Sequence, residues 1–450
     1  MVDTILKNVQ CLNDGSWCAT EIAIEAGRIV EMGASVLGAA REEVDGAGAY
    51  CLPGAIDLHV HFNEPGRTEW EGFATGSAAA AAGGATYVAE MPLNSVPSTT
   101  TVSALYAKQR AIQGKSWVDY GLWGGVVPGN ADHLPALAEA GVVGFKAFMS
   151  PSGTDDFENS DTATLREAMQ AIGPTGLRLA LHAEDPAVLH ESVIGLRQRE
   201  TATDWEASRP IQAELEAVRT AIDLAAETGC PITIVHVSAA EVVNLIDQAR
   251  AGGLDILCET CPHYLLLSLD DAERIGPQAK CAPPLRRVHE VSALWEQLHT
   301  GKIDTLGSDH SPCPPDLKTG VSFFEAWGGI AGVQHGLSGL LDSTGLAEAR
   351  RVGALSSLFA ARPAGAVGLS HKGGIAPGRD ADFMLVHPLE TKEAVQADAL
   401  LSRNPCSAYV GRALGLQVTA TWLRGCPVVE DGRLCGEPRG VFLAGMGCVT

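Results

Sequence analysis

Six residues of the types that bind divalent metal ions stand within or at the ends of apolar segments. His59 and His61 close the run GAIDLHVH, and Asp309 follows TLGS. The other three lie in equally apolar runs: Lys146 in VGFKAFM, His182 in LALH and His236 in ITIVH. Imidazole and carboxylate groups suit zinc and related first-row ions. We therefore predict a metal site made of all six side chains, with Asp309 also acting as a catalytic proton acceptor.

The spacing of the histidines supports this prediction. His59 and His61 are two residues apart, so on a strand both imidazoles point to the same face. His182 and His236 are single histidines, and each taken alone is as compatible with an ordinary buried residue. Two such histidines at equivalent strand ends favour metal binding.

Lys146 is the unusual member, because a charged amine in an apolar strand is disfavoured unless it is paired or modified. Its long side chain could extend along the apolar surface so that the amine reaches solvent at the end of the strand. Alternatively, its neutral amine could react with CO2 to give a carbamate, N6-carboxylysine, whose two oxygens can bridge two cations. Position leaves both explanations open, and the other five residues favour the carbamate. The expected cofactors are two divalent ions, zinc first and cobalt, manganese or iron as options, together with CO2.

A repeating pattern of strands and helices would position these residues. Apolar runs that read as strands are 54–61, 85–91, 118–123, 144–148, 177–183, 232–237, 254–260 and 303–309. Helical stretches between them are 72–82, 101–112, 131–140, 162–171, 213–228, 239–251 and 288–298. Eight strands alternating with helices predict an α/β fold, the (β/α)8 TIM barrel, whose active sites lie at the carboxyl ends of the strands.

The two ends of the chain have a different character. Residues 1–50 contain short alternating strands at 4–9, 18–25 and 28–32, and residues 373–430 again contain strands and turns. We expect a small β-sandwich-like domain assembled from 1–50 and 373–450, with the barrel domain, 51–372, between them. Domain termini tend to lie close together, which makes this insertion plausible.

Composition excludes several kinds of partner. The net charge of −22 disfavours nucleic acid and anionic membranes, which need a basic surface. The N-terminus lacks a basic segment followed by an apolar one, and no apolar stretch is long enough to span a bilayer. Together with 12 dispersed cysteines, this predicts a cytoplasmic protein with reduced thiols. One Cys-x-x-Cys pair, Cys258 and Cys261, is a weak indication of metal or redox chemistry.

The motifs resemble the amidohydrolase superfamily, specifically its cyclic amidohydrolases. The resemblance covers nearly the whole chain and includes PGAIDLHVHFNEPG, EMPLNSVPST, LHAED, CETCPHYL, KCAPPLR, SDHSPCPP and GGIAPGRDADF. It implies that a carboxylated Lys146 bridges two metals. His59, His61 and Asp309 would hold one metal, and His182 and His236 the other. It also implies a small-molecule substrate and a homotetramer.

Finer details distinguish subgroups of this family. Dihydroorotases carry an arginine where Asn63 stands, and hydantoinases use a tyrosine in the loop that here reads SPSGTDDFENS. The chain looks most like the allantoinases. This resemblance implies that the substrate is a neutral cyclic ureide, bound in a pocket that offers an asparagine and backbone groups rather than an arginine. Asn63, Cys281 and Ala282 are the expected substrate-binding residues, although Asn63 could equally cap its loop. Two alternative functions remain: a hydantoinase or dihydropyrimidinase, and a non-catalytic scaffold of the same fold.

Overall fold

The central element is a closed barrel of parallel strands. The computed structural model describes residues 1–196 and 199–447. One sheet pairs β6 (Ala55–Val60), β7 (Ala85–Glu90) and β8 (Asp119–Leu122). The other runs through β9 (Gly124–Gly125), β10 (Phe145–Phe148), β11 (Leu179–His182), β12 (Ile232–Ile234), β13 (Ile256–Thr260) and β14 (Thr305–Leu306).

The two sheets join at both edges. β8 pairs with β7 and, one residue later, β9 pairs with β10, so that 119–125 acts as one barrel strand. On the other side the His61 N–H donates to the His310 carbonyl at 2.8 Å, and Val60 and His310 form a parallel bridge. The predicted TIM barrel is therefore confirmed.

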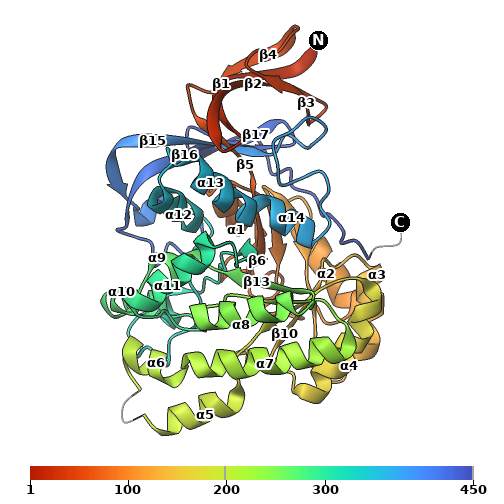
Figure 1. The fold of residues 1–450 in the computed structure, drawn as a ribbon, viewed down its shortest axis with the longest axis vertical. Coiled ribbons are helices and arrows are strands. Elements are labelled where there is room, and N and C mark those ends of the chain that lie inside the picture. Colours follow the sequence, from red (N-terminus) through yellow and green to blue (C-terminus); the bar gives the residue numbers. More distant parts are fainter. Residues whose placement is uncertain (197–198, 448–450) are drawn as a thin grey trace.

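Helices surround the barrel (Figure 1). All seven predicted helical stretches are present, and 131–140 splits into a 3₁₀ turn and α3. The bounds are α1 (Phe73–Ala82), α2 (Val102–Ile112), α3 (Leu134–Glu139), α4 (Thr162–Ile172), α7 (Ile211–Thr228), α8 (Ala240–Ala251) and α11 (Val288–His299). Shorter helices that the sequence analysis did not identify are α5 (Pro186–Ile194), α6 (Ala202–Ser208), α9 (Pro262–Leu266), α10 (Leu269–Ile275), α12 (Gly336–Thr344), α13 (Ala349–Ser356) and α14 (Arg362–Ala366).

Local sequence explains where several helices begin and how closely they pack. The side chain of Thr101 caps α2 by accepting from the Ala104 N–H, as preferred at a helix start. The alanine-rich α1 lies against the barrel so closely that a Cβ at Gly76 would stand 2.4 Å from the Phe62 ring. The small residues of α1 thus allow the close approach of helix and strand.

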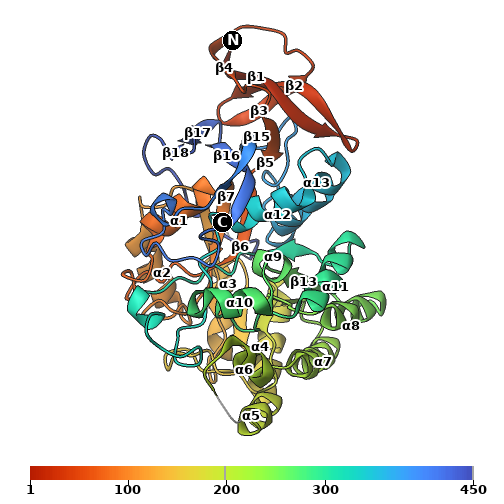
Figure 2. The same cartoon turned by 90° about the vertical axis from the view of Figure 1, so that its left-hand side faces the viewer.

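Strands from both ends of the chain form a second sheet. Figures 1 and 2 show the red N-terminal strands beside the blue C-terminal ones at one end of the molecule. The order is β18-β17-β16-β15-β5-β1-β2-β3, with β4 also paired to β1. The bounds are β1 (Val2–Asn13), β2 (Ser16–Glu25), β3 (Arg28–Gly33), β4 (Ala40–Asp45), β5 (Tyr50–Pro53), β15 (Phe383–Ala394), β16 (Ala413–Leu423), β17 (Cys426–Glu430) and β18 (Arg433–Leu434).

This sheet has its own apolar core, to which both chain ends contribute. Ile22 and Ile24 of β2 pack in one cluster with Phe383 of β15 and Trp422 of β16. The rings of Phe383 and Trp422 stack at 5.3 Å between centroids. The predicted β-rich part built from both ends is therefore present, with its strands hydrogen-bonded in one continuous nine-stranded sheet.

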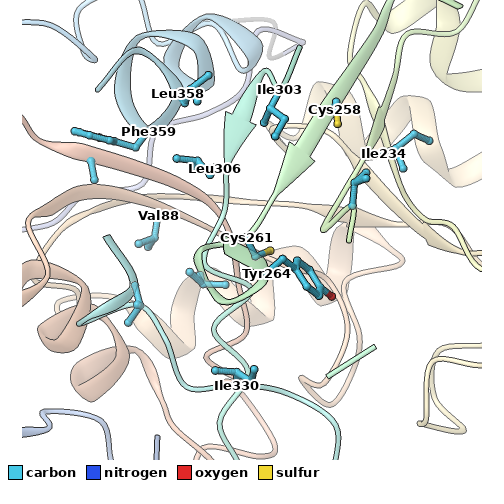
Figure 3. Packing of buried hydrophobic residues seen from close by; sticks show 14 of the residues in the cluster. Val88, Ile234, Cys258, Cys261, Tyr264, Ile303, Leu306, Ile330, Leu358 and Phe359 are labelled. Atoms are coloured by element: carbon cyan, nitrogen blue, oxygen red, sulfur yellow. The ribbon is translucent and has the colours of Figure 1, made fainter. Parts of the chain in front are cut away.

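The Cys-x-x-Cys pair belongs to the barrel core. Cys258 and Cys261 are buried among Ile234, Ile303 and Tyr264 (Figure 3). Burial raises the pKa of both thiols well above the usual range, which keeps them protonated and unreactive. The pair therefore serves packing. Among the described residues, no helix combines the length and the hydropathy that crossing a bilayer requires.

Candidate metal centre

Five of the six predicted metal-binding residues line one cavity at the carboxyl ends of the barrel strands. The cavity has a volume of about 350 Å³. Its lining includes His59, His61, His182, His236 and Asp309. Lys146 has no exposed surface and does not line the cavity.

The tightest cluster lies where the barrel closes. The Nε2 atom of His59 is 3.2 Å from Asp309 Oδ1, and the Nε2 atom of His61 is 3.4 Å from the same oxygen. One potential ligand atom from each of these three residues lies within 4.8 Å of the others. Strands at the first and last positions of the barrel thus present a His-His-Asp set of the kind that holds a divalent ion.

The other two histidines form a second pair nearby. His182 Nδ1 lies 3.0 Å from His236 Nε2, and their ring centroids are 4.7 Å apart. The His236 ring is also 5.5 Å from the His59 ring, centroid to centroid. All four imidazoles therefore form one continuous group.

Lys146 lies in β10 with its amine enclosed. Its Nζ atom has no hydrogen-bond partner among the described residues and is 5.1 Å from the centre of the Phe148 ring. Burial lowers the pKa of this amine to about 8, although the negative charges of Asp309 and Glu259 act to raise it. A neutral amine is the form that reacts with CO2, so the environment favours the predicted modification.

Burial also sets the charge of the other candidate ligands. It lowers the pKa of His61 to about 4 and that of His236 well below its usual value, so both imidazoles are neutral at pH 7. Burial alone would raise the pKa of Asp309, but His59 and His61 outweigh it and hold that pKa well below the usual range. Neutral imidazoles and an ionised carboxylate are the forms that bind metal ions.

Two of these residues adopt an unusual backbone conformation. His236 has φ 42° and Asp309 has φ 46°, in the left-handed region that non-glycine residues rarely adopt. Such strain costs on the order of 1–3 kcal/mol per residue and tends to occur at functional sites. Both residues lie just after the ends of their strands, where this backbone conformation sets the direction of the side chain.

Carboxylates outside the cavity orient the imidazoles. Glu259 Oε1 lies 2.7 Å from His59 Nδ1, and Glu184 Oε2 lies 2.8 Å from His182 Nε2. Asp57 accepts hydrogen bonds from the backbone of His59 and Ser308, each at 3.0 Å, and so ties the first strand to the last. Carboxylate–histidine pairs of this kind fix the tautomer of a metal-binding imidazole.

The donor set fits divalent cations by an independent criterion. Three buried nitrogens, Lys146 Nζ, His61 Nδ1 and His236 Nδ1, have no hydrogen-bond partner among the described residues. Buried polar atoms are normally satisfied, so unpartnered ones beside a carboxylate indicate a missing ligand or modification.

Only one of the three predicted substrate-binding residues lines the cavity. Ala282 lines the cavity, whereas Asn63 and Cys281 are buried outside its lining. The Asn63 backbone N–H donates to Glu90 at 3.0 Å, and its Nδ2 is 3.5 Å from the Pro312 carbonyl. These contacts fit the loop-capping alternative for Asn63.

The expectation of a pocket without an arginine was wrong. The cavity lining includes Arg209 and Lys280, contributed by loops far from Asn63 in sequence. Asn94, Trp205 and Trp327 also line it and were likewise not identified. Lys280 and Asn94 stood inside the quoted motifs KCAPPLR and EMPLNSVPST, but no local pattern indicated that their side chains face a shared cavity.

Comparison with known proteins identifies the class that this fold and site define. Residues 50–428 match the family model for the amidohydrolase family. The chain therefore belongs to the amidohydrolase family. Members of this family generally bind divalent metal ions, and the His59–His61–Asp309 cluster agrees with that property.

The similarity is more specific among curated relatives. An allantoinase of Rubrobacter xylanophilus is 48% identical over 449 residues, which are 98% of this chain and 97% of that one. An allantoinase of Solibacter usitatus is 42% identical, with 98% and 97% of the two chains covered.

Solved structures share the fold over its full length. The L-hydantoinase (dihydropyrimidinase) of Arthrobacter aurescens has a TM-score of 0.94 at 32% identity and covers 99% of this chain and 100% of its own. The dihydropyrimidinase of Brevibacillus agri has a TM-score of 0.90 at 25% identity, with 99% of each chain covered.

Proposed function

We propose that this protein hydrolyses the cyclic amide of allantoin to give allantoate. The observation that carries the proposal is the similarity to allantoinases over nearly the full length of the chain, at up to 48% identity. The ring C–N bond breaks, the carbonyl carbon gains the oxygen of water, and the ring nitrogen gains a proton.

The metal centre is part of the same proposal. His59, His61 and Asp309 would hold one divalent cation, His182 and His236 a second, and a carboxylated Lys146 would bridge them. The donor atoms favour zinc, with cobalt, manganese or iron as alternatives. Bound divalent cations acidify water and polarise a carbonyl oxygen, which is the chemistry that amide hydrolysis needs.

Asp309 is the residue that would move the proton. Its carboxylate is ionised, and it lies within 3.4 Å of both His59 Nε2 and His61 Nε2. It would take a proton from the attacking water and deliver it to the leaving nitrogen, acting first as a base and then as an acid. The four imidazoles would hold the cations at the carboxyl ends of the strands.

A substrate panel tests the proposal directly. The metal-reconstituted protein is assayed with allantoin, hydantoin, dihydrouracil and dihydroorotate, and the metal content per chain is measured in parallel. We expect the highest kcat/KM with allantoin and two divalent ions per chain. A clear preference for another ring would overturn the assignment, and a protein without metal would support the non-catalytic scaffold.

The alternative with specific support is hydantoinase or dihydropyrimidinase activity, because the solved structures that share this fold are described by those names. The structural likeness concerns the scaffold, whereas the closer sequence similarity is to allantoinases. The panel separates the two.

We also propose a homotetramer located in the cytoplasm. The 11 cysteines among the described residues are all free thiols, which is typical of a reducing compartment. Light scattering of the purified protein tests the assembly, with a molar mass four times that of the chain as the expected result.

A further inference from the structure

Arg209 is a cavity residue that the proposed chemistry does not use. It lies between α6 and α7, in the segment that follows β11, and its side chain is 16% exposed. It lines the same cavity as the metal-binding residues. Arg209 is absent from the His59–His61–Asp309 cluster, so it would meet a part of the substrate other than the reacting amide.

Neighbouring groups hold the guanidinium group of Arg209 in place. Its Nη1 donates to Glu184, whose Oε2 lies 2.8 Å from His182 Nε2. The guanidinium carbon lies 4.6 Å from the centre of the Trp205 ring. Trp205 is itself fixed, because its indole N–H donates to the Cys281 carbonyl at 2.8 Å.

The backbone at this position is anchored too. The Arg209 carbonyl accepts from Arg286 Nη1 at 2.7 Å, and Arg286 also donates to Glu214 and to Ser238 Oγ, each at 2.9 Å. Arg286 is fully buried. A side chain that rigid elements hold in one orientation is suited to specific recognition.

Most of the hydrogen-bond donors of Arg209 remain available. Among residues 1–196 and 199–447, Glu184 is the only group that accepts from this guanidinium. A guanidinium has five N–H donors in a planar fork, and those on Nε and Nη2 have no acceptor among the described residues.

The charge around Arg209 selects the kind of oxygen. Glu184 is a fully buried carboxylate in direct contact with the guanidinium and offsets its positive charge. Lys280 and Glu325 also line the cavity, so the two cations, Arg209 and Lys280, are matched by the two carboxylates, Glu184 and Glu325. The site therefore offers directed donors without a net positive charge, which favours a neutral carbonyl over a carboxylate.

We infer that Arg209 binds the carbonyl oxygen of the ureido substituent on the substrate ring, and so selects 5-ureido cyclic ureides over unsubstituted ones. This inference rests on the proposed function. The reacting ring amide must meet the His59–His61–Asp309 cluster. Arg209 contacts Glu184 on the Nε2 side of His182, whereas the Nδ1 side of that ring faces His236. A substituent that extends away from the reacting amide would meet Arg209.

The test compares two substrates that differ only in the ureido group. Arg209→Lys keeps a positive charge beside Glu184 but loses the planar fork. We expect kcat/KM for allantoin to fall about 10- to 100-fold, mainly through KM, because a charged hydrogen bond is lost. We expect the value for hydantoin to be nearly unchanged. Where hydantoin is not turned over, its competitive inhibition constant serves as the measurement and should likewise be unchanged.

Controls separate recognition from structure. Arg219→Lys alters an exposed arginine of α7 that pairs with Glu216, and it should leave both substrates unaffected. The metal content per chain should be unchanged in both variants. Arg209→Gln is a second variant, which also removes the charge and should lower the allantoin value further.

Several results would overturn the inference. Equal losses on allantoin and hydantoin would mean that Arg209 acts through Glu184 and His182 on the metal centre. An unchanged allantoin value would mean that it binds nothing. Selective loss of dihydroorotate turnover would mean that Arg209 binds a carboxylate. Failure of the wild-type protein to open the ring of allantoin would instead contradict the proposed function. The wild-type assay alone, without the variants, decides that point.

Discussion

Single buried residues carry the chemical character of this site. Lys146 and the imidazoles are enclosed by apolar strands, and burial disfavours their charged forms. Asp309 stays ionised because His59 and His61 surround it. Neutral imidazoles at His61 and His236 beside an ionised carboxylate are the forms that metal binding requires.

Lys146 provides the sharpest test of the proposed bridge. Lys146→Met keeps the length and the apolar stem but removes the amine, so the variant should lose most of its metal. Turnover should fall by at least about 100-fold, because even indirect damage to a metal site has effects approaching that size. Metal analysis and kcat measure both effects, and Lys302→Met, at a partly exposed lysine, is the matched control. Full metal content and turnover in Lys146→Met would rule out the bridge.

His263 should make stability depend on pH. It is 1% exposed, and burial lowers its pKa from 6.5 to about 4. The unfolded chain therefore takes up a proton near pH 6.5 that the folded chain takes up only near pH 4, and stability falls as pH drops through this window. The contribution is about 3 kcal/mol in total.

Thermal unfolding of the metal-free protein between pH 7 and pH 4 measures the effect. The melting temperature of His263→Gln should fall less steeply with acidification than that of the wild type. Parallel curves for the two proteins would show that His263 is not the titrating group.

At the scale of elements, a buried ion pair holds the loop that follows the first barrel strand. Glu90, at the end of β7, accepts the backbone N–H groups of Phe62 and Asn63 at 2.7 and 3.0 Å. Lys108 of α2 donates to Glu90 and to the Met91 carbonyl, each at 3.2 Å. The pair connects β7 and α2 to the segment directly after His61.

Removing one partner of this ion pair should destabilise the fold more than removing both. Lys108→Met leaves the carboxylate of Glu90 buried and uncompensated, which costs about 3–5 kcal/mol. The double variant Glu90→Gln, Lys108→Met should recover part of the lost melting temperature, because no buried charge remains. A double variant less stable than Lys108→Met would contradict this account.

The sequence predicted the long elements better than the short ones. All eight strands were identified because each is a short, mainly apolar run between turns, as buried parallel strands are. Short helices such as α6 and α9 span fewer than two turns, so they carry no clear periodic pattern. Their positions depend on the loops that they pack against.

At the scale of the whole molecule, one aspartate links the barrel to the sheet built from the chain ends. Asp119, at the start of β8, is 1% exposed. Its carboxylate lies 2.8 Å from Lys372 Nζ and also contacts Arg424, at the end of β16. Three parts of the chain that are far apart in sequence therefore meet at one buried charge cluster.

Asp119→Asn should lower the melting temperature and leave the chemistry intact. Lys372 would keep Asp380 and Asp382 as partners, so the expected loss is about 1.5–3 kcal/mol, the size of a hydrogen bond to a charged group. Because Asp119 lies at the amino end of its strand, opposite the cavity, kcat/KM at low temperature should be nearly unchanged. Asp132→Asn, at an exposed aspartate, is the control for both measurements. A variant with wild-type stability would show that the link contributes little.

The sequence alone determined the barrel and the residues at its strand ends, because strand periodicity and apolar runs are local properties. It could not show that His59, His61 and Asp309 stand within 4.8 Å of one another, which requires the first and last strands to meet. Nor could it show that Arg209 faces the cavity while Asn63 does not. The direction of a loop side chain depends on packing against residues that are distant in sequence, and only the closed tertiary structure brings those residues together.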